Sequence, residues 1–238
     1  MHQGRIPLIR VEHLCRGYQM GTEKVIALRD INITFYKGEI CSIFGASGSG
    51  KSTLLNLLAG MEKPSYGKIT IRGECITDMN ENEMAAFRQK NIGFVFQSYN
   101  LLPTLTAEEN VAMPLMFCGV ERQARLQAAR SVLKAVGLGE RMQHYPNQMS
   151  GGQQQRVGIA RAFVARPPIV FGDEPTGNLD SKTTVEIMEM MVRFVRGSGE
   201  TLILVTHNPE LVEYTDRMIT LKDGEIIQDE YTEKGKKI

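Results

Sequence analysis

The sequence contains few cysteines, and their arrangement is not that of a metal centre. The four cysteines are far apart and form no C-x-x-C pair, and only Cys15 has a histidine, His13, close to it in the sequence. Structural zinc sites need closely spaced cysteine and histidine ligands. We therefore expect buried or half-buried reduced thiols rather than a zinc site.

Long apolar runs and an excess of one charge are also missing. No uninterrupted apolar stretch approaches the roughly 18 to 20 residues that cross a bilayer, and the first residues contain no apolar signal core. Lys plus Arg number 28 and Asp plus Glu number 27, with the basic residues scattered along the chain. We therefore expect a cytosolic protein with no direct membrane insertion and no nucleic acid partner, which reaches a membrane only through another protein.

The order of β-rich and helical segments predicts an α/β fold. Runs of β-branched and aromatic residues come first and indicate an antiparallel layer that leads into a central strand: residues 6–15, 25–28, 31–35 and 39–44. Toward the end of the chain, strands alternate with helices: strands 169–173, 201–206, 217–221 and 225–228, and helices 183–195 and 209–214. Such alternation is typical of a mainly parallel sheet covered by helices.

The size of the chain fits one α/β domain that carries an inserted subdomain. At 238 residues, 42% of them hydrophobic, the chain can bury a substantial core. Thr106 and Glu109 form a helix start signal, and the residues that follow are helical in pattern. We interpret residues 101–166 as a helical subdomain inserted into a single domain over residues 1–238, and we expect residues 229–238 to be a mobile tail.

A glycine-rich loop between a predicted strand and a predicted helix is the first motif that indicates chemistry. Its residues are Gly45, Ala46, Ser47, Gly48, Ser49, Gly50, Lys51 and Ser52. The glycines let successive backbone N–H groups converge on phosphate oxygens, while Lys51 reaches the β- and γ-phosphates and the Ser52 hydroxyl ligates magnesium. Thr53 is a weaker candidate for the α-phosphate. The strand-loop-helix context predicts a site for a nucleotide and its magnesium ion.

Polar side chains follow several predicted strands. We expect Asp173 to bind the same magnesium ion and Glu174 to orient or deprotonate a water molecule. Gln97 follows the strand over residues 92–96 and can reach toward metal or water. His207 follows the strand over residues 201–206, where a satisfied cap and a ligand contact both fit. Tyr18, expected in a loop, fits either stacking on an adenine ring or an ordinary exposed position.

A second segment suited to phosphate opens a later helix: Ser150, Gly151 and Gly152, just before Gln153. The start of a helix offers unpaired N–H groups and the positive end of its dipole. One chain thus carries two anion cradles, and the second would be redundant if both served one nucleotide. We therefore predict that each cradle is half of a site that a second copy of the chain completes.

Taken in order, these motifs resemble those of the nucleotide-binding subunits of ATP-binding cassette transporters, over nearly the whole chain. The motifs are the loop over residues 45–52, Gln97, the segment 150–153, the acidic pair 173–174, residues 178–180 and His207. The resemblance implies a P-loop NTPase core with a mainly parallel sheet, an N-terminal antiparallel β layer and an inserted helical subdomain. It also implies ATP hydrolysis with Mg²⁺ as cofactor.

The same resemblance implies a role for each candidate residue. Lys51, Ser52 and Thr53 would hold the phosphates and Mg²⁺ of ATP. Gln97 would sense the nucleotide, Glu174 would polarise the attacking water, His207 would contact the γ-phosphate and Tyr18 would stack on adenine. Across a dimer, a further set would face the partner or the ATP that the partner holds: Ser150, Gly151, Gly152, Gln153 and Asp180.

Finer features resemble one subgroup, the macrolide-exporter and lipoprotein-releasing group, which includes peptide-resistance and cell-division members. These features are residues 96–103, 105–111 and 175–181. The likeness implies an integral membrane permease with few transmembrane helices as partner, and a position on the cytoplasmic face of the membrane. Met149 stands where leucine is usual and Gly172 where alanine is common, and neither change affects the charged groups.

Several alternatives stay open at this point. A division-type ATPase would drive a cell-wall hydrolase through its permease instead of moving cargo. A soluble cassette without a permease resembles tandem or coiled-coil proteins, for which this chain has no room. A small kinase needs an Arg-rich lid, whereas Arg122, Arg125 and Arg130 fall on an amphipathic helix. The apolar residues 111–117 fit either a wall of a docking groove for the permease or ordinary packing.

Overall fold

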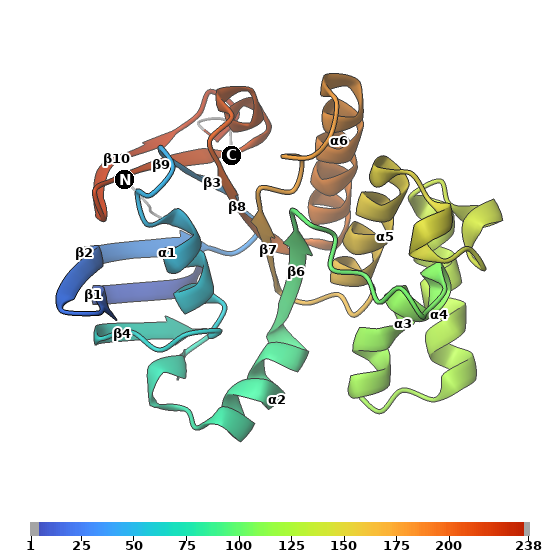
Figure 1. Ribbon diagram of the computed structural model, residues 1–238, viewed down its shortest axis with the longest axis horizontal. Helices are drawn as coiled ribbons and strands as arrows, with labels where there is room; N and C mark the ends of the chain where they lie inside the picture. Colours follow the sequence, from blue (N-terminus) through green and yellow to red (C-terminus); the bar gives the residue numbers. More distant parts are fainter. Residues whose placement is uncertain (1–4, 236–238) are drawn as a thin grey trace. The chain divides into compact units, whose positions relative to one another are not determined.

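The computed structural model describes residues 5–235 and contains two compact units. The first unit joins the residues up to Arg88 with those from Thr201 onward, and the second unit is Gln89–Glu200. Both units combine strands and helices (Figure 1), which confirms the predicted α/β class. Among the helices of the described residues, none has the length and apolar character needed to cross a bilayer.

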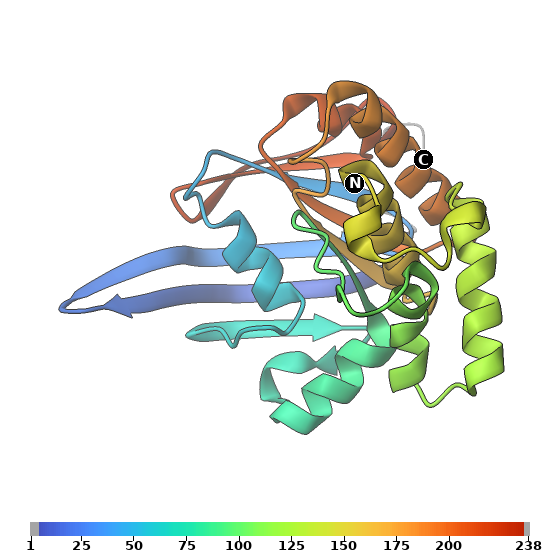
Figure 2. The ribbon, with the colours of Figure 1, turned by 45° about the vertical axis from the view of Figure 1, so that its right-hand side comes forward.

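An antiparallel sheet forms one part of the first unit, as the sequence predicts. Its strand order is β2-β1-β4-β5, and its members are β1 (Pro7–Met20), β2 (Glu23–Tyr36), β4 (Tyr66–Ile71) and β5 (Glu74–Cys75). Figure 2 shows β1 and β2 as a long hairpin with β4 beside it. Leu14, Leu28 and Ile69 bury their side chains from three of these strands and anchor the sheet on the core.

Strands β1 and β2 are longer than the strands predicted over residues 6–15, 25–28 and 31–35. The predicted strands stop near points where the pairing of β1 with β2 is irregular. The β1–β2 register shifts at several points, and His13 (φ 49°) and Asp30 (φ 46°) adopt left-handed backbone conformations. Such bulges break the alternation of buried and exposed residues that a strand is recognised by. Tyr18 pairs with Val25 in this ladder, so the prediction that it lies in a loop is wrong.

The other part of the first unit is a mainly parallel arrangement of strands in the order β10-β9-β3-β8. Strand β3 (Ile40–Phe44) runs parallel to both β8 (Thr201–Thr206) and β9 (Arg217–Lys222), while β10 (Glu225–Tyr231) is antiparallel to β9. The helices of this unit are α1 (Lys51–Leu58), the 3-10 helices η1 (Ile76–Asp78) and η4 (Pro209–Tyr214), and α2 (Glu81–Asn91), which leads to the second unit.

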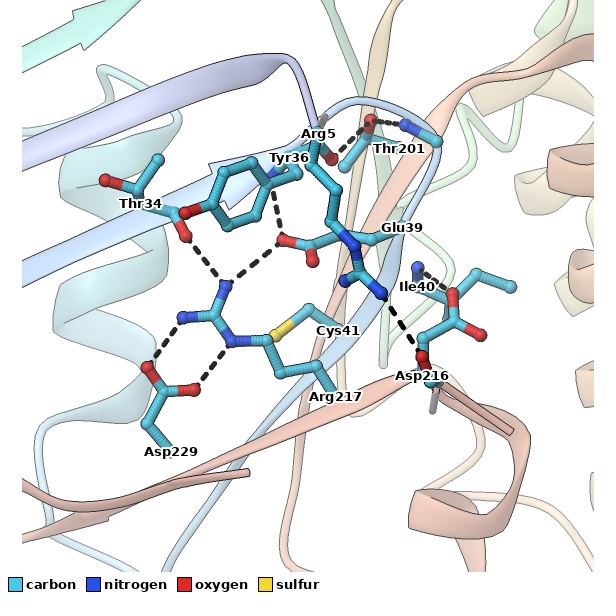
Figure 3. Close-up of polar contacts among 12 residues, drawn as sticks. Arg5, Thr34, Tyr36, Glu39, Ile40, Cys41, Thr201, Asp216, Arg217 and Asp229 are labelled. Atoms are coloured by element: carbon cyan, nitrogen blue, oxygen red, sulfur yellow. Dashed lines mark hydrogen bonds and ion pairs between the residues drawn. The ribbon is translucent and has the colours of Figure 1, made fainter. Parts of the chain in front are cut away.

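A polar cluster around the buried Arg217 ties β10 to its neighbours (Figure 3). The Arg217 guanidinium donates to both carboxylate oxygens of Asp229, at 2.6 Å each, and to the Thr34 carbonyl at 2.7 Å. Glu39 lies against the same guanidinium at 3.5 Å. Because β10 continues to Tyr231, its last residues are not part of a tail that starts at residue 229. The end of the predicted tail, residues 236–238, lies outside the described residues.

The second unit packs helices around two parallel strands, β6 (Ile92–Phe96) and β7 (Ile169–Asp173). Its α-helices are α3 (Ala107–Phe117), α4 (Arg122–Ala135), α5 (Gly151–Phe163) and α6 (Ser181–Ser198), and its 3-10 helices are η2 (Gly139–Arg141) and η3 (Pro146–Gln148). The predicted helix start is confirmed, since Thr106 and Glu109 cap α3 reciprocally. This unit also contains β6, β7 and α6, so the boundaries 101–166 of the helical subdomain stay a prediction.

Candidate functional site

The loop between β3 and α1 has a backbone path that requires glycine. A Cβ atom at Gly45 would lie 2.3 Å from the Leu221 carbonyl oxygen, and one at Gly50, whose φ is 100°, would lie 2.5 Å from the Ala27 oxygen. Gly48 also has a left-handed φ, of 80°. These glycines let the loop curl tightly against β9 and β2, as loops that bind phosphate through their backbone amides do.

The side chains of this loop fit a phosphate ligand. Lys51 is buried and its Nζ donates to the Ala46 carbonyl at 2.7 Å, so the ammonium group is folded over the loop. The Ser49 Oγ atom is buried without a hydrogen-bond partner among the described residues. Helix α1 begins at Lys51, its N-cap residue Gly50 provides no side-chain cap, and its first turn contains no acidic residue. An anion at this helix start could accept a hydrogen bond from the Ser49 hydroxyl.

Strand register brings His207 to the same edge as this loop. Phe44 pairs with Thr206 at the carboxyl ends of β3 and β8, so Gly45 and His207 are the next residues of neighbouring parallel strands. The cap of η4 is Asn208, whose Oδ1 accepts from the Glu210 N–H at 3.0 Å. The exposed imidazole of His207 lies at the carboxyl end of β8, where parallel sheets bind ligands, and its role there stays a prediction.

In the second unit, strand register brings Gln97 and Glu174 together. Phe96 pairs with Asp173, so Gln97 and Glu174 each follow the paired ends of β6 and β7. A Cβ atom at Gly177 would lie 2.7 Å from Gln97 Nε2, which shows how closely the loop after β7 approaches that amide. Glu174 has a φ of 44°, a conformation uncommon for a residue with a side chain.

The magnesium ligands predicted from the sequence are divided between the two units. Ser52 belongs to the first unit, and Gln97 and Asp173 belong to the second. No three His, Cys, Asp or Glu side chains within residues 5–235 cluster tightly enough to hold a metal ion by themselves. Magnesium is commonly bound by one or two protein oxygens together with substrate phosphates, and this donor set fits that use. Their joint coordination stays a prediction.

The second predicted cradle does start a helix, and its serine is a helix cap. Ser150 Oγ accepts from the Gln153 N–H at 3.3 Å, and Gln153 Oε1 accepts from the Ser150 N–H at 3.1 Å. This cap uses the Gln153 N–H, which leaves the predicted segment Ser150, Gly151 and Gly152 as the candidate cradle. The N–H groups of Gly151 and Gly152 and the hydroxyl proton of Ser150 are the donors that suit an anion.

Close contacts explain the glycines of this segment. A Cβ atom at Gly151 would lie 2.8 Å from the hydroxyl oxygen of Tyr99, and one at Gly152 would lie 2.9 Å from Cγ2 of Thr183. Asp180 caps α6 by accepting from the Thr183 N–H at 3.0 Å and from its hydroxyl at 2.7 Å. These bonds lower the pKa of the Asp180 carboxyl, which remains exposed.

Two buried residues of α5 that sequence reasoning missed hold the neighbouring loops in place. Arg161 donates to the carbonyl oxygens of Asn100 at 2.5 Å and Tyr99 at 2.8 Å, and Gln155 donates to the carbonyl of Pro175. The loops after β6 and β7 therefore share one support, the helix that Ser150 opens. An arginine and a glutamine on an otherwise apolar helix face were the available signal.

Tyr18 lies half-buried on β1 in the first unit. Its hydroxyl donates to Glu62 Oε2 at 2.7 Å, and the Arg16 guanidinium lies 4.5 Å from its ring centroid. The ring is therefore held at its hydroxyl end and on one face. Neither contact excludes a flat ligand stacked on the ring.

Comparisons with known proteins show the family of the chain. Residues 28–177 match the protein family described as ABC transporter. The lipoprotein-releasing system ATP-binding protein LolD of Geobacter metallireducens is 45% identical, covering 93% of this chain and 99% of that protein. The macrolide export ATP-binding/permease protein MacB of a Shewanella species is 44% identical over 97% of this chain, which spans only 35% of that longer protein.

A solved structure gives the same fold. It is described as the dimeric post-hydrolysis state of the ATP-binding cassette MJ0796 bound to ADP and Pi. It has a TM-score of 0.88 and 41% sequence identity, and the match covers 94% of this chain and 98% of that one. An uncharacterised ABC transporter ATP-binding protein of Methanocaldococcus jannaschii is 46% identical over 93% of this chain and 98% of its own length.

Proposed function

This chain belongs to the ABC transporter family, and from that premise we propose that it is the ATP-hydrolysing subunit that drives a membrane permease. The observation that carries the proposal is that two helix starts, one capped by Gly50 and one by Ser150, are each suited to an anion. One chain needs only one of them for one nucleotide. Each therefore belongs to a different ATP site, and two copies of the chain together complete two sites.

Within each site the residues divide the chemistry. The loop amides, Lys51 and Thr53 bind the triphosphate, and Tyr18 stacks on the adenine. Magnesium, held by Ser52, Gln97 and Asp173, would neutralise charge on the phosphate oxygens. Glu174 takes a proton from water as the water oxygen bonds to the γ-phosphorus, and the bond to the ADP oxygen breaks.

Three further groups complete the site. His207 contacts the γ-phosphate from the sheet edge that it shares with the loop. Ser150 and the amides after it contact the γ-phosphate of the ATP that the partner holds, and Gln153 supports that turn through its bond to the Ser150 N–H. Asp180, at the start of α6, lies at the interface between the copies.

The partner in the membrane would contact the outer end of α3. Val111 and Ala112 are buried, so the first part of the apolar segment packs inside the unit, whereas Met116 is 44% exposed and Phe117 is 64% exposed. A cavity of about 130 Å³ lies between α3 and α4, and Met113 is among the residues that line it. Of the two alternatives for residues 111–117, ordinary packing therefore fits the buried first part of the segment, and docking of the permease fits its exposed end.

An Arg-rich kinase lid finds no support in α4. Arg130 forms an ion pair with the Glu108 carboxylate at 2.7 Å, and Arg125 donates to the Val120 carbonyl at 3.1 Å. The relatives with assigned roles act in macrolide export and lipoprotein release. We infer a role of that kind at the cytoplasmic face of the membrane, with the cargo selected by the permease.

A variant that binds ATP but does not hydrolyse it tests this function. Glu174→Gln keeps the shape of the side chain but cannot accept the water proton. With saturating ATP and Mg²⁺ the variant should form a stable dimer in sedimentation velocity, and hydrolysis should fall by about a hundredfold or more. Glu189→Gln, at an exposed position on α6, is the control. A Glu174→Gln chain that stays monomeric at saturating ATP would contradict the proposal.

A further inference from the structure

The hydroxyl end of Tyr18 is held by a carboxylate that no motif includes. Tyr18 Oη donates to Glu62 Oε2 at 2.7 Å, and Arg16 Nη2 donates to the same oxygen at 3.0 Å. The second oxygen, Oε1, accepts from Asn56 Nδ2 at 3.1 Å. Three side chains from β1 and α1 thus converge on Glu62, which lies in the connection between α1 and β4.

This network fixes both the charge and the position of Glu62. Burial alone would raise the pKa of the Glu62 carboxyl, but hydrogen bonds from Tyr18 and Asn56 and the charge of Arg16 bring it below its ordinary value. The carboxylate is therefore ionised at neutral pH and accepts all three bonds. Arg16 Nη1 also donates to the Lys63 carbonyl at 2.9 Å, which ties the next residue to β1.

Glu62 is connected directly to α1, the helix that follows the loop over residues 45–52, which we call the phosphate loop. Asn56 lies on α1, and its carbonyl accepts from the Met61 N–H at 2.8 Å. Gly60 adopts a left-handed φ of 62° in the turn that ends α1, and a Cβ atom there would lie 2.3 Å from Met84 Sδ. The turn has little freedom, so Glu62 has a fixed place relative to Lys51 at the other end of α1.

The ring of Tyr18 is held on one face as well. The Arg16 guanidinium lies 4.5 Å from the ring centroid, within the range of a cation–π contact. A ring covered by a guanidinium on one face accepts a second flat group on the other. The hydroxyl bond to Glu62 then sets the angle at which that second face is presented.

We propose that Glu62 is a positioning residue that sets the distance and angle between the base platform, Tyr18, and the phosphate loop at the start of α1. This inference rests on the proposed function, in which Tyr18 stacks on adenine. Glu62 touches neither base nor phosphate; it acts through Tyr18 on one side and Asn56 on the other. It therefore raises affinity for ligands that have both a base and a triphosphate.

Two ligands separate this role from a general effect on folding. MgATP has a base and a triphosphate, whereas magnesium tripolyphosphate has only the phosphate chain. Calorimetry on the full chain should show Glu62→Ala binding MgATP about three- to tenfold more weakly, with magnesium tripolyphosphate affinity changed less than twofold. Glu12→Ala, an exposed glutamate on β1, should change neither affinity.

Tyr18→Phe provides an independent measurement, because it removes only the hydroxyl that Glu62 accepts from. It should weaken MgATP binding, and the loss in the double variant should be clearly smaller than the product of the two single losses. The proposal would be overturned if Glu62→Ala lost MgATP and tripolyphosphate affinity equally, or if its MgATP affinity were unchanged. It would also be overturned if the losses of the two single variants multiplied in the double variant. If the unmodified chain bound neither ligand, the proposed function itself would fail instead.

Discussion

At the scale of single residues, Glu39 is a carboxyl group in an unusual position. Its side chain is 5% exposed, Oε1 accepts from the Tyr36 N–H at 2.7 Å, and Oε2 is buried without a hydrogen-bond partner among the described residues. Burial raises the pKa of Glu39 to about 7, because the Tyr36 bond and the Arg217 charge offset only part of the desolvation. The folded protein therefore holds this proton up to neutral pH, whereas the unfolded chain releases it near its ordinary pKa of 4.5.

The sign of the resulting pH dependence follows from the stronger proton binding of the folded state. The contribution of Glu39 to the free energy of unfolding is fully present below about pH 4.5 and is lost as the pH rises through about 7. The total loss is at most about 3 kcal/mol. Glu39→Gln resembles the protonated form and should not show this loss.

Urea unfolding of both proteins between pH 5 and 8 measures this effect. The stability of Glu39→Gln relative to the unmodified chain should increase steadily with pH over that range. Glu230→Gln, at an exposed position on β10, should show a constant difference. A constant difference for Glu39→Gln as well would mean that the carboxyl titrates normally.

At the scale of elements, the first turn of α5 is contacted both by the loop after β6 and by α6. Gly151 and Gly152 are both closely approached, but by different side chains: Tyr99 from the loop after β6 and Thr183 from α6. Arg161, farther along α5, holds the backbone of that same loop through two carbonyl bonds. The loop after β6 therefore contacts α5 near both of its ends.

The contact between Gly151 and Tyr99 can be tested by paired substitutions. Gly151→Ala places a methyl group 2.8 Å from the Tyr99 hydroxyl oxygen and should lower the free energy of unfolding by about 1–2 kcal/mol. Tyr99→Phe removes that oxygen and leaves the ring carbon Cζ at 3.7 Å, an ordinary contact. The double variant should therefore regain most of the lost stability in urea unfolding.

Gly152→Ala is the matched control, because its methyl group would meet Thr183 instead of Tyr99. Tyr99→Phe should give it no rescue. Equal rescue of both alanine variants, or none for Gly151→Ala, would show that Tyr99 does not limit the space at Gly151.

The sequence predicts the elements that carry motifs more accurately than it predicts features that depend on tertiary packing. The phosphate loop, the strand ends at Phe96 and Asp173 and the cap at Ser150 follow from local rules on glycine, apolar runs and capping residues. The continuity of β1 through Tyr18 was missed, because bulges disturb the alternation that identifies a strand. The anchors Arg161 and Gln155 were missed because their partners are carbonyl groups distant in sequence, which no local pattern encodes.

At the scale of the whole molecule, two copies of the chain would share their two proposed ATP sites. The loop before α1 and the start of α5 both suit phosphate, and each described unit contains one of them. A site built from the loop of one copy and the α5 start of another uses both without redundancy. The dimeric form of the similar cassette MJ0796 is in keeping with such sharing.

Mixing two damaged chains tests this sharing most directly. On a Glu174→Gln background, one chain carries Lys51→Ala and the other Ser150→Phe, and radiolabelled ATP retained after rapid desalting is measured. Neither chain alone should retain ATP. The mixture should recover retention, because a mixed dimer contains one site with an intact loop from one chain and an intact α5 start from the other. Retention in the mixture no greater than the sum of the separate chains, under conditions where the Glu174→Gln parent retains ATP, would contradict the account.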